Sequence, residues 1–97
     1  MIHIVICDDE KQMSDHIRTF VSDFFRKKNR EISLRTFLSG EELLNYDGQI
    51  DILFLDIQMN GMDGMETARK LRADKFRGFL IFITVLKEMV FQSFEVQ

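Results

Sequence analysis

Residues 51–56 read DILFLD, a continuous apolar run that begins and ends with an aspartate. An apolar run without polar alternation is typical of a central strand in a parallel sheet, which is covered on both faces. Two other runs also indicate strands: IHIVI at residues 2–6, followed by Cys7 and two aspartates, and FLIFI at residues 79–83, followed by Thr84. The sequence therefore predicts three strands that each lead into polar side chains.

The segments between these strands carry helical patterns. Residues 10–28 place apolar side chains at helical spacing along one stripe. Ser39 and Glu42 form a capping box that opens a short second helix. A third helix is expected after Gly64, and a last one from about Lys87. Each predicted helix therefore follows a predicted strand.

Residues 32–37 alternate apolar and polar side chains, as a half-exposed edge strand does. The resulting order, strand then helix repeated four times, predicts an α/β fold with a doubly wound parallel sheet. We expect its core to contain the phenylalanines at positions 20, 24, 25, 37, 54, 79 and 82.

Composition is that of one small globular domain. The chain has 97 residues, 45% hydrophobic and 30% charged, with a net charge of −3. No apolar run in the sequence is long enough to cross a bilayer, and the start lacks the basic region of a signal peptide, so we expect a cytoplasmic protein. The single cysteine, Cys7, excludes an internal disulfide. The basic cluster at residues 26–30 complements the end of a helix dipole, an interpretation favoured over DNA contact.

Acidic side chains lie where the strands end. Asp8 and Asp9 follow the first strand, Asp56 ends the third and Thr84 ends the fourth. Ligands bind outside the carboxyl ends of parallel strands, where three carboxylates would converge and repel unless a cation joined them. Oxygen ligands of this kind suit Mg²⁺. Asp56 can act as a nucleophile that forms an acyl phosphate, and Thr84 can donate a hydrogen bond to it. The alternative interpretation of Asp9 is structural: its side chain could cap the helix that begins at Glu10.

At this point the sequence resembles the receiver domain of two-component response regulators. The resemblance covers all 97 residues and implies one receiver domain over 1–97, with a flavodoxin-like strand order 2-1-3-4. The residues that carry it are Ile2 to Glu10, Ser39 to Leu44, Asp51 to Met59, Met62 to Met65 and Ile81 to Thr84.

The resemblance implies a role for each polar residue. Asp56 would be the phosphoacceptor, Asp9 a direct Mg²⁺ ligand and Asp8 a ligand acting largely through metal-bound water. The backbone carbonyl of Gln58 would complete the protein ligands, and Thr84 would be the switch hydroxyl. The family implies a sensor histidine kinase as phosphoryl donor and slow self-hydrolysis of the acyl phosphate.

The chain departs from the family pattern in three places. Asn60 stands where proline is usual, which predicts a less rigid loop. Val85 replaces a small residue and would narrow access to Asp56. The sequence stops at Gln97, before the aromatic switch residue, the fifth strand with its lysine and the fifth helix. We therefore expect an incomplete receiver domain that is not stably phosphorylated by itself.

Residues 91–96, FQSFEV, resemble regulators that carry a LytTR DNA-binding domain further along the chain. Any contact with DNA, and transcriptional output, would then come through that missing domain. Strand 79–83 would be an open edge, with Met89, Val90, Phe91 and Phe94 nearby. This arrangement predicts a homodimer or edge-mediated self-association, or else disorder in residues 86–97.

Two other functions are alternatives to a signalling switch. A phosphatase of the haloacid-dehalogenase type also uses an aspartate nucleophile and Mg²⁺, but it needs a second aspartate two residues later, where this chain has Gln58. A non-phosphorylated interaction or dimerisation module would not need the acids at positions 8, 9 and 56. We therefore expect a phosphoacceptor signalling domain and not an enzyme acting on an external substrate.

Overall fold

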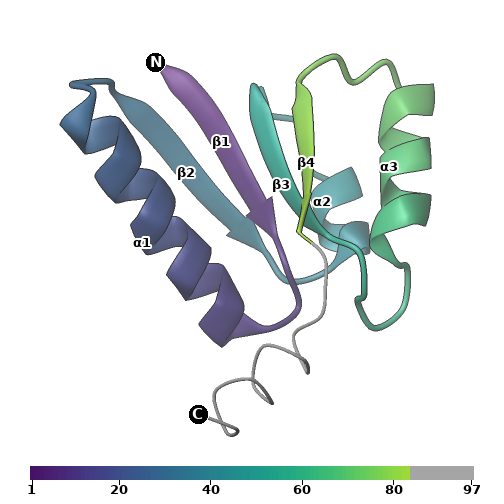
Figure 1. Cartoon of the computed structure of the whole chain (residues 1–97). Coiled ribbons are helices and arrows are strands. Elements are labelled where there is room, and N and C mark those ends of the chain that lie inside the picture. Colours follow the sequence, from purple (N-terminus) through teal and green to yellow (C-terminus); the bar gives the residue numbers. More distant parts are fainter. Residues whose placement is uncertain (84–97) are drawn as a thin grey trace, which may run out of the picture.

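The computed structural model describes residues 1–83, which form a four-stranded parallel sheet and three helices (Figure 1). The strand order is β2-β1-β3-β4, so the predicted doubly wound order is confirmed. The element bounds are β1 Ile2–Cys7, α1 Lys11–Lys27, β2 Ile32–Phe37, α2 Gly40–Leu44, β3 Ile52–Asp56, α3 Gly64–Ala73 and β4 Phe79–Ile83. Thr84, Val85, the helix expected from Lys87 and the apolar residues of that helix lie outside the described residues.

The two central strands carry the core. Leu53 and Leu55 of β3 are fully buried beside Val5 and Cys7 of β1, as the apolar runs predict. On one face of the sheet these side chains pack against α2 and α3, and α1 lies on the other face (Figure 1). The cluster between the sheet and the paired helices α2 and α3 consists of Val5, Cys7, Leu43, Leu53, Leu55, Met59, Ala68 and Leu71.

Side-chain caps mark the starts of helices α2 and α3. The Ser39 hydroxyl accepts a hydrogen bond from the Glu42 amide at 3.1 Å, which confirms the expected capping of α2. Asp63 caps α3 in the same way, through the Glu66 amide at 2.9 Å. β2 pairs only with β1 among the described strands and is half-buried along its length, as expected for an edge strand.

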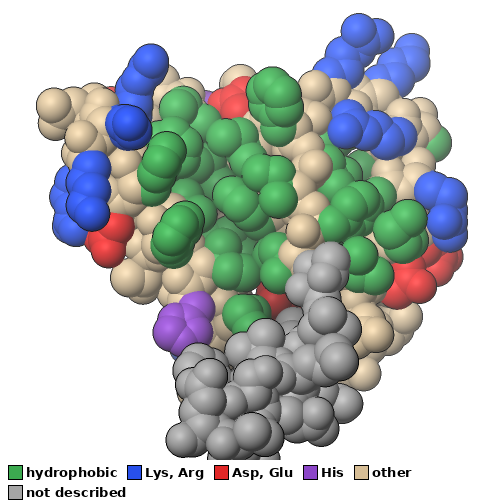
Figure 2. All heavy atoms as spheres, in the orientation of Figure 1, with side chains coloured by type: hydrophobic (Ala, Val, Ile, Leu, Met, Phe, Trp, Pro, Cys, Tyr) green, Lys and Arg blue, Asp and Glu red, His purple; other side chains and the backbone are tan. Residues whose placement is uncertain are grey.

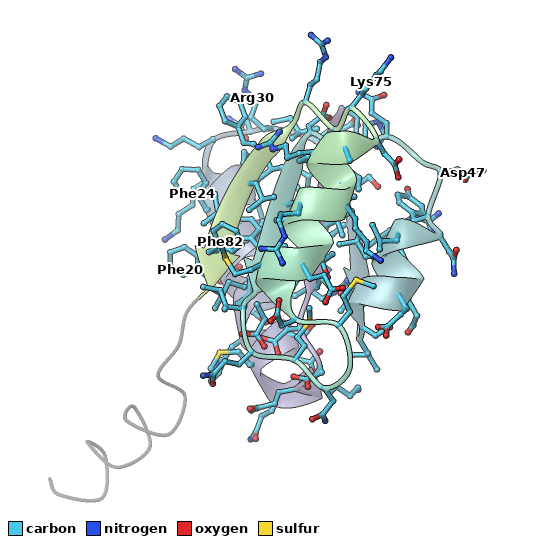
Figure 3. All side chains as sticks on the ribbon, turned by 90° about the vertical axis from the view of Figure 1, so that its right-hand side faces the viewer. Phe20, Phe24, Arg30, Asp47, Lys75 and Phe82 are labelled. Atoms are coloured by element: carbon cyan, nitrogen blue, oxygen red, sulfur yellow. The ribbon has the colours of Figure 1, made fainter. Side chains whose placement is uncertain are left out.

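Several phenylalanines expected in the core lie at the surface. Phe20 of α1 is 73% exposed and Phe79 of β4 is 76% exposed, and Phe24 and Phe82 are also exposed. Figure 2 shows hydrophobic side chains spread over the face between α1 and β4, and Figure 3 shows Phe20 and Phe24 projecting on that side of the sheet. The prediction was wrong for these residues because apolar spacing identifies a face and does not say whether another element covers it.

β4 is the last strand of the described sheet on its side, and Phe79, Ile81 and Phe82 are exposed along it. An edge strand with apolar side chains is a template for pairing with another chain. The structure holds one chain, so the expected homodimer stays a prediction. The helix expected from Lys87, which would form the other part of the predicted dimer surface, lies outside residues 1–83.

Asp51 joins three strands at the amino end of the sheet. Its carboxylate accepts hydrogen bonds from the His3 amide at 2.7 Å and from the Gln49 side chain at 3.0 Å. Its own amide donates to the His3 carbonyl, and its carbonyl accepts from the Phe79 amide at 2.9 Å. The His3 amide, followed by Gln49, lowers the pKa of the Asp51 carboxyl below its usual range. Asp51 therefore fixes β1 and β4 against the start of β3.

This network predicts a pH-dependent contribution to stability. A lowered folded pKa means that the ionised carboxylate stabilises the folded state above the ordinary carboxyl pKa of 3.8, and that this stabilisation is lost as the pH falls through the lowered value. We expect Asp51→Asn to unfold at lower urea concentration than the wild type at neutral pH, with the gap closing in strong acid. Asp47→Asn, at an exposed loop residue, is the control. A gap that is constant with pH would contradict the assignment.

Candidate functional site

Three carboxylates meet at the carboxyl end of the sheet. β1 and β3 are hydrogen-bonded neighbours with Cys7 opposite Leu55, so the next residues along, Asp8 and Asp56, leave the sheet side by side. Together with Asp9 they offer carboxylate oxygens that all lie within 4.8 Å of one another. The predicted convergence of the acidic residues is confirmed. Thr84, the fourth member of the predicted site, lies outside the described residues.

Burial distinguishes the three acids. Asp8 is 0% exposed and Asp56 is 1% exposed, whereas Asp9 is half-buried. Carboxylates at this separation repel each other, and burial removes the water that would screen them. Two buried acids beside a third are therefore a costly arrangement that a cation bound between them would stabilise.

The acid pair after β1 is held by loops and does not cap the following helix. Asp8 accepts a hydrogen bond from the Glu10 amide at 2.9 Å, and Asp9 accepts one from the Asn60 amide at 2.9 Å. Helix α1 begins at Lys11, with Glu10 before it and no side-chain cap. The alternative interpretation of Asp9 as a helix cap is thus wrong, because its carboxylate faces the loop after β3.

The loop between Asp56 and α3 is tightly fitted. The Gly64 amide donates to the Ile57 carbonyl at 2.8 Å, and Gly61 adopts a φ of +76°, a conformation that favours glycine. A Cβ at position 64 would lie 2.1 Å from the Asp56 carbonyl oxygen and 2.8 Å from the Ile57 Cα. Gly64 therefore lets the first turn of α3 rest directly on the backbone of the candidate phosphoacceptor.

Cys7 lies beneath the acids as a buried packing residue. Its thiol donates to the Ser39 carbonyl at 3.4 Å, and its sulfur lies 3.8 Å from the Met59 sulfur. Burial, followed by the charges of Asp8 and Asp56, raises the pKa of the Cys7 thiol to about 12. The thiol stays protonated at neutral pH, which is the behaviour of a small hydrophobic side chain.

The donor set fits a hard divalent cation. The cluster found among residues 1–83 consists of carboxylates alone, with no histidine or cysteine ligand, and oxygen donors are what Mg²⁺ and Ca²⁺ prefer. The predicted contribution of the Gln58 carbonyl stays a prediction. Within the same residues, no helix has the length and apolar character needed to cross a membrane.

Sequence reasoning located the acids but missed the contact between Asn60 and Asp9. A loop amide leaves no pattern in the sequence, because any residue except proline can donate it. The absence of proline at position 60 is the feature of the sequence that permits the contact, since proline has no N–H to donate.

The sequence of this chain is similar to those of known proteins. The family model described as the response regulator receiver domain matches residues 4–96. The sensory transduction protein LytT of Oceanobacillus iheyensis is 31% identical over 101 residues, which cover 99% of this chain and 39% of that protein. The chain thus spans 39% of the length of this curated relative, well under two thirds.

Two solved structures are also similar. The response regulator protein TrrA of Thermotoga maritima, in complex with Mg²⁺-BeF, is 29% identical with a TM-score of 0.68, over 91% of this chain and 73% of that chain. A chain from the complex of histidine kinase ThkA with TrrA is 31% identical with a TM-score of 0.62, over 88% of this chain and 70% of that chain.

The fit of Gly64 predicts a large effect from one methyl group. Gly64→Ala would push its Cβ into the Asp56 carbonyl, and α3 or the Asp56 backbone would have to move. We expect a loss of about 2–3 kcal/mol in the free energy of unfolding, measured by urea denaturation and circular dichroism. Gly48→Ala is the control, since the nearest atoms to its Cβ would belong to the Tyr46 side chain and not to backbone. Equal stability of the two variants would contradict the close packing.

Proposed function

Because this chain belongs to the response regulator receiver domain family, we propose that it accepts a phosphoryl group on Asp56. The donor is a sensor histidine kinase, and Mg²⁺ is held by Asp8, Asp9 and Asp56 together with the Gln58 carbonyl. The observation that carries the proposal is the convergence of three carboxylates within 4.8 Å at the ends of neighbouring strands. Phosphorylation then switches a downstream DNA-binding output.

The chemistry assigned to Asp56 is nucleophilic. One carboxylate oxygen attacks phosphorus, the bond from phosphorus to the donor nitrogen breaks, and that nitrogen keeps the electron pair and takes up a proton. The product is an acyl phosphate, which water later hydrolyses to regenerate the carboxylate. The nucleophile is held in place from its own backbone, because Asp56 ends β3 and its carbonyl lies under the first turn of α3.

The acids beside Asp56 need a cation for this reaction. An incoming phosphoryl group carries negative charge and would be repelled by Asp8 and Asp9, which belong to the same cluster. When bound, Mg²⁺ would neutralise that charge and coordinate phosphoryl oxygens. Asp9, which is half-buried, is proposed as the direct ligand, and the fully buried Asp8 acts through metal-bound water. Thr84 is proposed to donate its hydroxyl hydrogen to the phosphoryl group.

The relatives support the proposed partners. TrrA, whose fold this chain shares, was solved with Mg²⁺-BeF and also with the histidine kinase ThkA. LytT is named a sensory transduction protein, and another relative, YpdB of Escherichia coli, is named a transcriptional regulatory protein. A DNA-binding output would lie in the part of such proteins that this chain does not span.

Metal binding tests the acidic cluster directly. We expect the chain to bind Mg²⁺ weakly, because water would supply most ligands, and we expect Asp9→Ala and Asp56→Ala each to abolish binding. Isothermal titration calorimetry at neutral pH measures the affinity. Asp47→Ala, at an exposed loop acid, should bind as the wild type does. Unchanged affinity in both cluster variants would show that the ligands are assigned wrongly.

Phosphorylation tests the role of Asp56. The protein, incubated with Mg²⁺ and phosphoramidate, should gain the mass of one phosphoryl group, and hydroxylamine should remove it because an acyl phosphate is labile. Asp56→Asn should gain nothing. A label that persists in Asp56→Asn, or that resists hydroxylamine, would place the phosphoryl group on another residue.

A further inference from the structure

The loop after β3 reaches across the site to the acid pair after β1. The Asn60 amide donates a hydrogen bond to the Asp9 carboxylate, with 2.9 Å between the amide nitrogen and Oδ2. The two residues are 51 positions apart in sequence. This contact connects the two loops that border the cluster, and it reaches the acid that is the least buried of the three.

The amide is held in place from both sides. Met59, immediately before it, is 9% exposed, belongs to the core cluster and lies 3.8 Å from the Cys7 sulfur. Gly61, immediately after it, has a φ of +76°. The direction of the Asn60 N–H is therefore set by the backbone and by core packing. The Asn60 side chain is exposed and takes no part in this contact.

We propose that the backbone N–H of Asn60 is a positioning group for Asp9, which it holds toward the cation site before Mg²⁺ binds. Asp8 is fully buried and accepts a hydrogen bond from the Glu10 amide, whereas the half-buried Asp9 side chain accepts one from the Asn60 amide. A carboxylate offers about four lone-pair positions, so one accepted N–H is compatible with metal ligation by the same side chain. The inference rests on the proposed metal site.

Hydrogen bonds to metal-binding side chains orient them and raise affinity. The Asn60 N–H also donates to a charged acceptor, which makes the bond stronger than one between neutral groups. Proline has no N–H, so the contact between position 60 and Asp9 depends on the departure from the proline that is usual in the family. The dependence lies in the backbone, because any residue other than proline supplies the donor.

The experiment separates the amide from the side chain. Asn60→Ala keeps the N–H and should bind Mg²⁺ as the wild type does, whereas Asn60→Pro should bind roughly tenfold more weakly in calorimetric titration. An ester bond in place of the peptide bond between residues 59 and 60 removes the same N–H without the proline ring, and should cause the same loss. This second variant keeps the test valid if proline distorts the loop.

A measurement without metal complements the titration. In the metal-free wild type, the Asn60 amide should exchange slowly with solvent by NMR despite its exposed position, and Asp9→Ala should make it exchange fast. Wild-type affinity in the ester variant would overturn the positioning role while leaving the metal site intact, as would an amide whose exchange ignores Asp9. A wild-type chain that binds no Mg²⁺ would refute the proposed metal site, and the positioning role with it.

Discussion

The parallel pairing of β1 with β3 is the constraint on which the rest of the molecule depends. Parallel neighbours end at the same edge of a sheet, so the residues after each strand come together whatever the intervening chain does. The register, with Cys7 opposite Leu55, decides which residues these are. A shift of one residue would place Asp56 against a different neighbour and would reverse the faces of β3. The apolar side chains of β1 and β3 fix this register, and the acidic cluster follows from it.

The sheet and the acids could be predicted from the sequence because both follow from short-range rules. The four residues between Asp51 and Asp56 are all apolar, which favours a buried strand. The Ser39 cap is likewise a local pattern. The contact between Asn60 and Asp9 was not predictable in this way, because it joins backbone and side chain across 51 residues and depends on how two loops meet.

The exposed phenylalanines show that burial is also difficult to predict from the sequence. Phe20 and Phe24 lie one turn apart on α1, at a spacing that would serve equally well for a buried or an open stripe. Burial depends on what lies opposite, and local periodicity carries no information about that. Position 60 illustrates a related limit: the sequence shows that proline is replaced, and only the structure shows that the replacement supplies a hydrogen-bond donor.

The first turn of α3 and the backbone of Asp56 are in such close contact that neither can move without the other. No side chain separates Gly64 from the Asp56 carbonyl, and protein interiors are too densely packed to absorb a displacement there. A shift of this peptide unit would therefore have to be accommodated by a shift of the ten-residue helix α3. The same glycine thus ties the position of α3 to the position of the Asp56 backbone.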